Sequence, residues 1–112
     1  MKKITAIVRP EMLEPIKEAL FAKKIRGMTI SQIQGCGNQH GWTEYYRGSE
    51  LVLNMVPKVQ FEIVLEDEAC DEITQLICDV ACTGEVGDGK IFLSPVEDLI
   101  RIRTGERGTS AL

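Results

Sequence analysis

The sequence lacks the features of a membrane-spanning, secreted or disordered chain. In its 112 residues no uninterrupted apolar run approaches the roughly 18 residues that span a bilayer. No basic-then-apolar leader is present, because Lys2 and Lys3 are followed at once by Thr5 and then Arg9. Hydrophobic residues make up 44% and charged residues 27% of the chain, as in a globular domain. We therefore expect a single domain, residues 1–112, in the cytoplasm and without membrane insertion.

Closely paired cysteines are absent and histidine occurs once. The four cysteines are Cys36, Cys70, Cys78 and Cys82, with no Cys-x-x-Cys pair and no set of histidines to complete a zinc site. We interpret them as reduced, buried thiols that act as small apolar residues. The one histidine, His40, has no carboxylate or nucleophile at a useful spacing. Catalysis through it therefore has little support.

Positive charge is in deficit and unevenly distributed. The formal net charge of −4 argues against a general nucleic-acid-binding role. Residues 1–50 carry 8 Lys and Arg against 5 Asp and Glu, whereas residues 51–112 carry 5 against 12. Five acids fall within Glu66–Glu72. They are typical of the first turns of a helix, where the macrodipole favours negative charge. An acidic patch for a metal or a partner is the other interpretation.

A strand–helix–strand pattern occurs twice along the chain. Alternating apolar residues predict strands, and apolar residues three and four apart predict helices. The strands are predicted at Lys3–Val8, Met28–Gln34, Val59–Leu65, Ile91–Leu93 and Leu99–Arg103. One helix passes through Leu13 and Leu20 and is ended by Gly27, and the other follows the acids and ends near Gly84. This order predicts a ferredoxin-like α+β fold with an antiparallel sheet. Two helices on one face would leave a bare apolar face, which suggests that subunits pack sheet against sheet.

Three segments fall outside this repeat. Residues 37–55 separate two predicted strands by far more than the about 2–5 residues of a hairpin loop, and such long loops are generally functional or disordered. Residues 82–90 contain three glycines before Lys90. Residues 101–112 begin with Arg101 and Arg103, which would share one face of the last predicted strand. These segments hold the candidate functional residues.

The glycine-rich segment has the composition of an anion-binding loop. Gly84, Gly87 and Gly89 allow backbone N–H groups to turn inward around an anion, and Lys90 adds a point charge. It is not a Walker A motif, because Ile91 stands where Ser or Thr is needed and a strand follows instead of a helix. An ordinary glycine turn, and a solvated strand face for the two arginines, are the other interpretations. Bidentate guanidinium donors beside this loop favour polyphosphate binding.

Seven short strings occur in order along the chain. They are Lys2-Lys3-Ile4, Arg9-Pro10, Gly27-Met28-Thr29, Gly41-Trp-Thr-Glu-Tyr-Tyr-Arg-Gly48, Val56-Pro57-Lys58, Thr83-Gly-Glu-Val-Gly-Asp-Gly-Lys-Ile-Phe92 and Ile100-Arg-Ile-Arg-Thr-Gly-Glu106. Together they resemble the PII signal-transduction proteins, the nitrogen-status sensors of bacteria, archaea and plastids. The resemblance covers essentially all of the chain without an evident gap, and the last two strings are the most specific in combination.

The resemblance implies a regulatory homotrimer with three sites in the clefts between ferredoxin-like subunits. ATP and ADP compete there, and 2-oxoglutarate binds beside ATP and Mg²⁺. The implied nucleotide-binding positions are Ile7, Thr29, Gly35, Gly37, Asn38, Gln39, Glu62, Val64, Gly87, Asp88, Gly89, Lys90, Arg101 and Arg103. The implied 2-oxoglutarate positions are Arg9, Gln39, His40, Gly41 and Lys58, with Gln39 also the Mg²⁺ ligand.

The resemblance also implies that residues 37–55 bind partner proteins. Gln39 would bond to the metal or release it, so that the ligand decides the shape of the loop. In channel-binding relatives the residue at the position of Arg47 enters the pore of an ammonium channel, and a nitrogen-metabolism enzyme is the other kind of partner. Ser49 matches a serine that is phosphorylated in some cyanobacterial members.

Three residues depart from the family pattern. Asn38 stands where many relatives have an arginine that reaches the phosphates, which puts the balance between ATP and ADP in doubt. His40 replaces a common lysine near 2-oxoglutarate and adds a titratable group. Leu51 replaces the tyrosine that some members carry as a nucleotidylylation site, and leucine has no hydroxyl to modify.

Two other functions remain open from the residues alone. One is a small ATP-hydrolysing enzyme that would use Lys90, Arg101 and Asp88. The other is a metal-sensing trimer that would use Cys36 and His40, which are four residues apart. Two ligands rarely suffice for a metal site. A regulatory protein that is not itself an enzyme is the reading that the resemblance favours.

Overall fold

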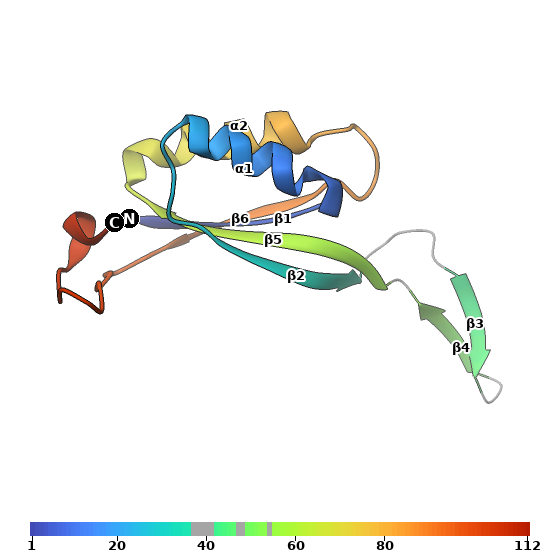
Figure 1. Cartoon of the computed structure of the whole chain (residues 1–112). Coiled ribbons are helices and arrows are strands. Elements are labelled where there is room, and N and C mark those ends of the chain that lie inside the picture. The colour runs from blue at the N-terminus through green and yellow to red at the C-terminus, as the bar shows by residue number, and fades with distance from the viewer. Residues whose placement is uncertain (37–41, 47–48, 54) are drawn as a thin grey trace.

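The computed structural model describes residues 1–36, 42–46, 49–53 and 55–112. Its elements in chain order are β1 (Lys2–Val8), the 3-10 turn η1 (Pro10–Met12), α1 (Leu13–Ala22), β2 (Thr29–Cys36), β3 (Trp42–Tyr46), β4 (Ser49–Leu53), β5 (Met55–Leu65), α2 (Asp67–Ala81), β6 (Gly89–Pro95) and the 3-10 turn η2 (Gly108–Ala111). The larger sheet has the strand order β2-β5-β1-β6, and each neighbouring pair is antiparallel. Both α-helices lie on one face of it (Figure 1). The α+β, ferredoxin-like prediction is confirmed.

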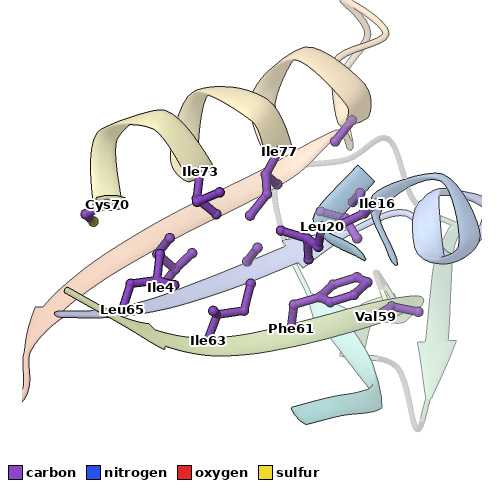
Figure 2. Packing of buried hydrophobic residues seen from close by; sticks show 13 residues of the cluster. Ile4, Ile16, Leu20, Val59, Phe61, Ile63, Leu65, Cys70, Ile73 and Ile77 are labelled. Atoms are coloured by element: carbon purple, nitrogen blue, oxygen red, sulfur yellow. The ribbon is translucent and has the colours of Figure 1, made fainter. Parts of the chain in front are cut away.

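The core lies between this sheet and the helices. Ile4, Ala6 and Val8 of β1 are buried, and they pair in register with Ile63, Phe61 and Val59 of β5. Side chains of a strand alternate between faces, so one set of positions on both strands points toward the helices. Figure 2 shows Ile4, Phe61 and Ile63 on the side of the sheet that faces the helices, together with Ile16 and Leu20 of α1 and Ile73 and Ile77 of α2. Each large apolar side chain that is fully buried contributes about 1.5–3 kcal/mol.

Both α-helices end earlier than their predicted ends at Gly27 and near Gly84. Helix α1 ends at Ala22, and Lys24 takes the left-handed conformation with φ 63°. Gly27 therefore does not terminate the helix, because the chain has already turned when it reaches that residue. Helix α2 ends at Ala81, and the amide of Cys82 donates to the carbonyl of Cys78. Gly84 belongs to the loop that follows.

The predicted strand Leu99–Arg103 is wrong. Ile100 forms one isolated bridge with Arg107, and residues 102–104 form a turn. The amide of Gly105 donates to the carbonyl of Arg101, and the amide of Arg101 donates to the carbonyl of Glu106. Gly105 adopts a positive φ of 74°, which reverses the chain before a strand can extend. The arginines at 101 and 103 are therefore not held on one face of a strand.

Residues 37–55 are not a loop throughout. Strands β3 and β4 pair antiparallel from Trp42 opposite Leu53 to Tyr46 opposite Ser49. Aromatic, β-branched and other apolar residues give this stretch a strand propensity that its polar neighbours obscured. The pair lies beyond the ends of β2 and β5, away from the helices (Figure 1). The long segment between the second and third core strands thus contains a small sheet of its own.

The sheet face opposite the helices, called the open face below, is mixed rather than apolar. Its apolar members include Ile7 and Phe92, whereas Lys3, Thr5 and Glu62 stand beside them. Phe92 is 52% exposed. The prediction of a bare apolar face is wrong, because polar residues occupy most of the outward positions of β5 and β2.

The cysteines do not share one environment. Cys70 is fully buried against the core, as predicted. Cys36, Cys78 and Cys82 are exposed, so the prediction of buried thiols is wrong for these three. Helix α2 buries Ile73, Ile77 and Ala81 at a spacing of four, and Cys78 follows Ile77 onto the solvent side.

Candidate functional site

The loop between α2 and β6, residues 82–88, is held in a conformation that needs glycine. Gly84, Gly87 and Gly89 have φ values of 84°, 104° and 111°. Gly89 also comes so close to β1 that a Cβ there would lie 1.8 Å from the carbonyl oxygen of Ile7. A side chain would therefore be strained and would clash with backbone. The three predicted glycines are thus required by the fold of the loop, which is hereafter called the glycine loop.

The carboxylate of Asp88 organises this loop from within. Oδ2 accepts the amide hydrogens of Thr83 and Gly84 at 2.7 and 3.0 Å, and Oδ1 accepts the hydroxyl of Thr83. Oδ1 also accepts Nε of Arg9 at 3.1 Å. The side-chain and backbone hydrogen bonds from Thr83, together with Arg9 and Gly84, hold the pKa of Asp88 far below its ordinary value. Asp88 is therefore ionised at neutral pH, and its carboxylate holds the loop together.

Two cations tie the glycine loop to the sheet. Nη2 of Arg9 donates to the carbonyl of Val86 at 2.8 Å, in addition to the ion pair with Asp88. Nζ of Lys58 donates to the carbonyl of Gly87, and Lys58 is 9% exposed. A pocket of about 460 Å³ opens beside them, lined by Arg9, Pro10, Glu11, Val56, Pro57, Lys58 and Val86. Two cations that face one open pocket can receive a small dianion.

Lys90 follows the loop directly and lies on the open face. It is the second residue of β6 and pairs in register with Ile7. Its ammonium group has no hydrogen-bond or ion-pair partner within the described parts of the chain. Lys90 therefore lies next to the glycine loop without a partner among the described residues, and its role in anion binding stays a prediction.

Arg101 and Arg103 lie at the opposite end of the sheet from the glycine loop. Strand β6 pairs Gly89 with Val8 at one end and Pro95 with Lys2 at the other. The five steps from Lys90 to Pro95 cover about 17 Å at the rise of a strand. The arginines follow beyond that end (Figure 1). One subunit therefore does not bring Lys90 together with the two arginines.

The two arginines also differ from one another. Nη1 of Arg101 contacts Glu106 at 3.3 Å, and Nη2 donates to the carbonyls of Ala111 and Leu112 at 3.1 Å each. Arg101 thus stabilises the turn that carries it. Arg103 is exposed, and no such contact is found for it among the described residues. Arg103 is therefore the stronger candidate for ligand binding, because its guanidinium is not used to hold the turn.

Five of the implied nucleotide-binding positions are distributed along the open face: Ile7, Thr29, Gly35, Glu62 and Val64. Ile7 lies beside Lys90, whereas Glu62 pairs with Thr29 on β2, nearer the Met1 end. Val64 lies two residues further along β5, and Gly35 is near Lys58, whose Cγ a Cβ would approach to 3.3 Å. Glu62 accepts a hydrogen bond from Gln60 at 2.8 Å. These residues share a face without converging on one point.

Several predicted residues lie outside the described part of the chain. They are Gly37, Asn38, Gln39, His40, Gly41 and Arg47. Ser49 and Leu51 lie on β4, of which the backbone pairing is described. The pairing of Cys36 with His40 as a metal site therefore falls partly outside the described residues. Among the residues that the structure describes, no three His, Cys, Asp or Glu side chains are grouped as a metal site requires.

Asp88 is one of the implied nucleotide-binding positions, although a single acid beside glycines is more often a turn residue. In the structure both of its oxygens accept hydrogen bonds from the protein. The sequence predicts no role for Thr83, which donates two of these bonds. The signal was present as a threonine followed five residues later by an aspartate across a glycine turn. An ATP-hydrolysing arrangement of Lys90, Arg101 and Asp88 is not assembled within one chain, because Arg101 lies at the other end of the sheet.

The fold and loop define a class: a ferredoxin-like α+β domain with a glycine loop that two cations hold against the sheet. Comparison with known proteins places it more closely. The family model of the nitrogen regulatory protein P-II matches residues 1–106. The chain therefore belongs to the P-II family of nitrogen regulatory proteins.

Relatives named nitrogen regulatory protein P-II align over the whole chain. The protein from Azospirillum brasilense is 48% identical over 112 residues, and that from Microchaete diplosiphon is 51% identical, each with full coverage of both chains. A protein from Methanothermobacter thermautotrophicus, named nitrogen regulatory protein P-II 2, is 48% identical over 112 residues, which cover 97% of its length. Their names describe regulators. In the described residues no helix is long and apolar enough to cross a membrane.

Proposed function

We propose that this chain is a cytoplasmic sensor of nitrogen, carbon and energy status that binds ATP or ADP and 2-oxoglutarate and regulates partner proteins through residues 37–55. Membership of the P-II family supports the regulatory role. The observation that carries the ligand assignment is the glycine loop, which Lys90 follows directly and whose carbonyls accept hydrogen bonds from Arg9 and Lys58.

The phosphate groups are assigned to two half-sites. The first half-site is the glycine loop with Lys90, where backbone N–H groups and an ammonium receive anionic oxygens. The second half-site is Arg103, with Arg101 behind it, at the far end of the sheet. Since one chain keeps the two apart, a complete site forms where the first half-site of one subunit meets the second half-site of a neighbour. A closed ring of three such contacts is a homotrimer with three sites.

The pocket beside Arg9 and Lys58 is assigned to 2-oxoglutarate. The two carboxylates of 2-oxoglutarate match the guanidinium of Arg9 and the ammonium of Lys58, because both residues line this pocket. Mg²⁺, when it is bound with ATP, would supply positive charge that offsets the charge of the anionic ligands. The Mg²⁺ ligand implied by the resemblance is Gln39, outside the described residues, and the oxygens of Asp88 are already engaged.

Signal output is assigned to the segment that contains β3 and β4. It projects from the sheet next to the glycine-loop end, so a ligand held by Gln39 at its base can change the population of its conformations (Figure 1). Arg47 is the proposed contact to an ammonium channel, and a nitrogen-metabolism enzyme is the other candidate partner. Ser49 is a candidate phosphorylation site.

Single substitutions test the two half-sites. Lys90→Ala and Arg103→Ala should each weaken ATP binding about ten- to hundredfold, because each removes a charge-assisted phosphate bond. Lys17→Ala removes the same charge as Lys90→Ala from α1, where Lys17 pairs with Glu14 on the surface, and should leave the affinity unchanged. Isothermal titration calorimetry measures the three variants. Unchanged affinity in both half-site variants would show that the assignment is wrong.

Mixed assemblies test whether the half-sites come from different subunits. Subunits with Lys90→Ala, and subunits with Arg103→Ala, should each form trimers that bind ATP weakly. A mixed trimer contains a contact at which an intact Lys90 meets an intact Arg103, so mixing should restore tight ATP sites. Native mass spectrometry identifies the mixed trimers, and calorimetry counts the sites. Mixed trimers without restored sites would refute the shared site, and a monomer would refute the trimer.

A further inference from the structure

Two peptide planes of the glycine loop are shared by the two proposed ligand sites. The carbonyls of Val86 and Gly87 accept hydrogen bonds from Arg9 and Lys58. All peptide bonds that the structure describes in this loop are trans, so each N–H points away from the carbonyl of its own plane. The N–H groups of Gly87 and Asp88 therefore point away from the two cations. They are available to an anion on the opposite side.

Arg9 reaches the loop with one edge of its guanidinium. Nε and Nη2 are bonded to Asp88 and to Val86, which uses two of the five N–H donors of arginine. The remaining donors have no partner within the described residues, and Arg9 is one of the residues that line the pocket. Lys58 likewise uses one of its three donors on Gly87. Each cation can therefore hold the loop and receive a carboxylate at the same time.

Asp88 decides the position of Arg9. Its Oδ2 is fixed by the amides of Thr83 and Gly84, and its Oδ1 is left to the Thr83 hydroxyl and Arg9. The ion pair is partly shielded, because the side chains of Arg9 and Asp88 are 24% and 22% exposed. Arg9 in turn orients the peptide plane of Val86 and Gly87.

We propose that Asp88 is a positioning residue which, through Arg9, aims the loop amides at phosphate and the free guanidinium edge at a dicarboxylate, and so couples the two sites. This proposal rests on the function proposed above. Loss of the contact lets Arg9 and the peptide planes take other orientations, so both ligands lose prepared donors. The coupling is reciprocal, since each ligand stabilises the arrangement that the other needs.

The direction in which one substitution changes ligand affinity distinguishes a positioning role of Asp88 from a purely electrostatic one. Asp88→Asn removes a negative charge close to two anionic ligands, so long-range electrostatics alone would strengthen the binding of ATP and of 2-oxoglutarate. Positioning predicts the opposite: both should bind about tenfold more weakly, the effect of one charge-assisted hydrogen bond. Thr83→Ala should weaken both in the same direction and by less, because it removes one donor to Asp88 and keeps the ion pair.

Glu85→Gln is the matched control. It removes the same charge from the same loop, and Glu85 makes no side-chain contact within the described residues. It should leave both affinities unchanged or slightly tighter. Calorimetry with ATP, with 2-oxoglutarate and with both measures each variant, and adenosine, which has no phosphate, should bind Asp88→Asn as well as it binds the wild type.

The outcomes separate this proposal from the one on which it rests. If the wild type binds neither ATP nor 2-oxoglutarate, the proposed function itself is wrong. If the wild type binds both, and Asp88→Asn binds them as tightly as or more tightly than Glu85→Gln, the positioning role of Asp88 is refuted. If adenosine binding falls together with ATP binding, the loss is a general structural one and the proposal is refuted as well.

Discussion

Replacement of Gly89 by alanine should destabilise the protein far more than the same replacement at Gly84. Both residues belong to the glycine-rich segment and both have positive φ, 111° and 84°. They differ in the space around them. A Cβ at Gly84 meets nothing within 4 Å, whereas a Cβ at Gly89 would lie 1.8 Å from the carbonyl oxygen of Ile7 and 2.8 Å from its carbonyl carbon.

The magnitude follows from two costs at Gly89. An alanine held in this backbone region costs about 1–3 kcal/mol. Relief of the clash requires β6 to move away from β1 at the pairing of Gly89 with Val8, which removes one or two hydrogen bonds of about 1 kcal/mol each. The free energy of unfolding should therefore fall by about 2–5 kcal/mol in Gly89→Ala. In Gly84→Ala only the conformational cost of about 1–2 kcal/mol applies.

Urea unfolding followed by circular dichroism measures both variants, at one protein concentration because assembly affects apparent stability. ATP titration adds a second measurement, since a displaced β6 also displaces Lys90. Equal losses in the two variants would refute the reasoning, because the closeness of Gly89 to β1 would then have no energetic consequence. A loss confined to Gly84→Ala would refute it more strongly.

The remaining predictions concern the pH dependence of stability and covalent modification of the chain. Hydrogen bonds from Thr83 to Asp88, and from Leu99 and Arg107 to Asp98, lower the pKa of both carboxyls. Both acids therefore stabilise the fold when ionised, and this stability should be lost as the pH falls below about 4, where the unfolded chain takes up protons first. Urea unfolding at neutral and acid pH measures the effect. Between the two pH values Asp88→Asn should lose less free energy of unfolding than the wild type, and an equal loss would contradict the prediction. A uridylyltransferase that acts on tyrosine-bearing relatives should leave the intact mass unchanged, because Leu51 has no hydroxyl, and a mass gain on this chain would show that another residue is modified.

The sequence by itself determined the class of fold and the position of the glycine-rich turn before Lys90. The alternation in β1 and β5 and the helical spacing in α1 and α2 are local, repeated over many residues, and follow directly from which face is buried. Three glycines before Lys90 also have a local meaning, since positive φ is a property of the residue itself. The family strings gave the remaining ligand positions as implications of a resemblance.

The sequence pattern gave wrong boundaries or elements where a turn competes with the strand or helix that the pattern predicts. The segment Leu99–Arg103 has a strand-like alternation, but Gly105 reverses the chain and Arg101 is used to hold that turn. The length of residues 37–55 predicts a loop, and within it the strand propensity of residues 42–53 produces β3 and β4. Helix ends were placed at glycines, while Lys24 made the turn in one case.

Tertiary structure alone decided which residues act together. Arg9, Lys58 and the glycine loop are far apart in sequence. They meet because β5, β1 and β6 are adjacent in the sheet, and β1 ends where β5 and β6 begin. The same antiparallel arrangement places Lys90 at one end of β6 and the segment with Arg103 beyond the other. Proximity across strands depends on register and strand order, which long-range packing sets, so no local pattern of residues contains it.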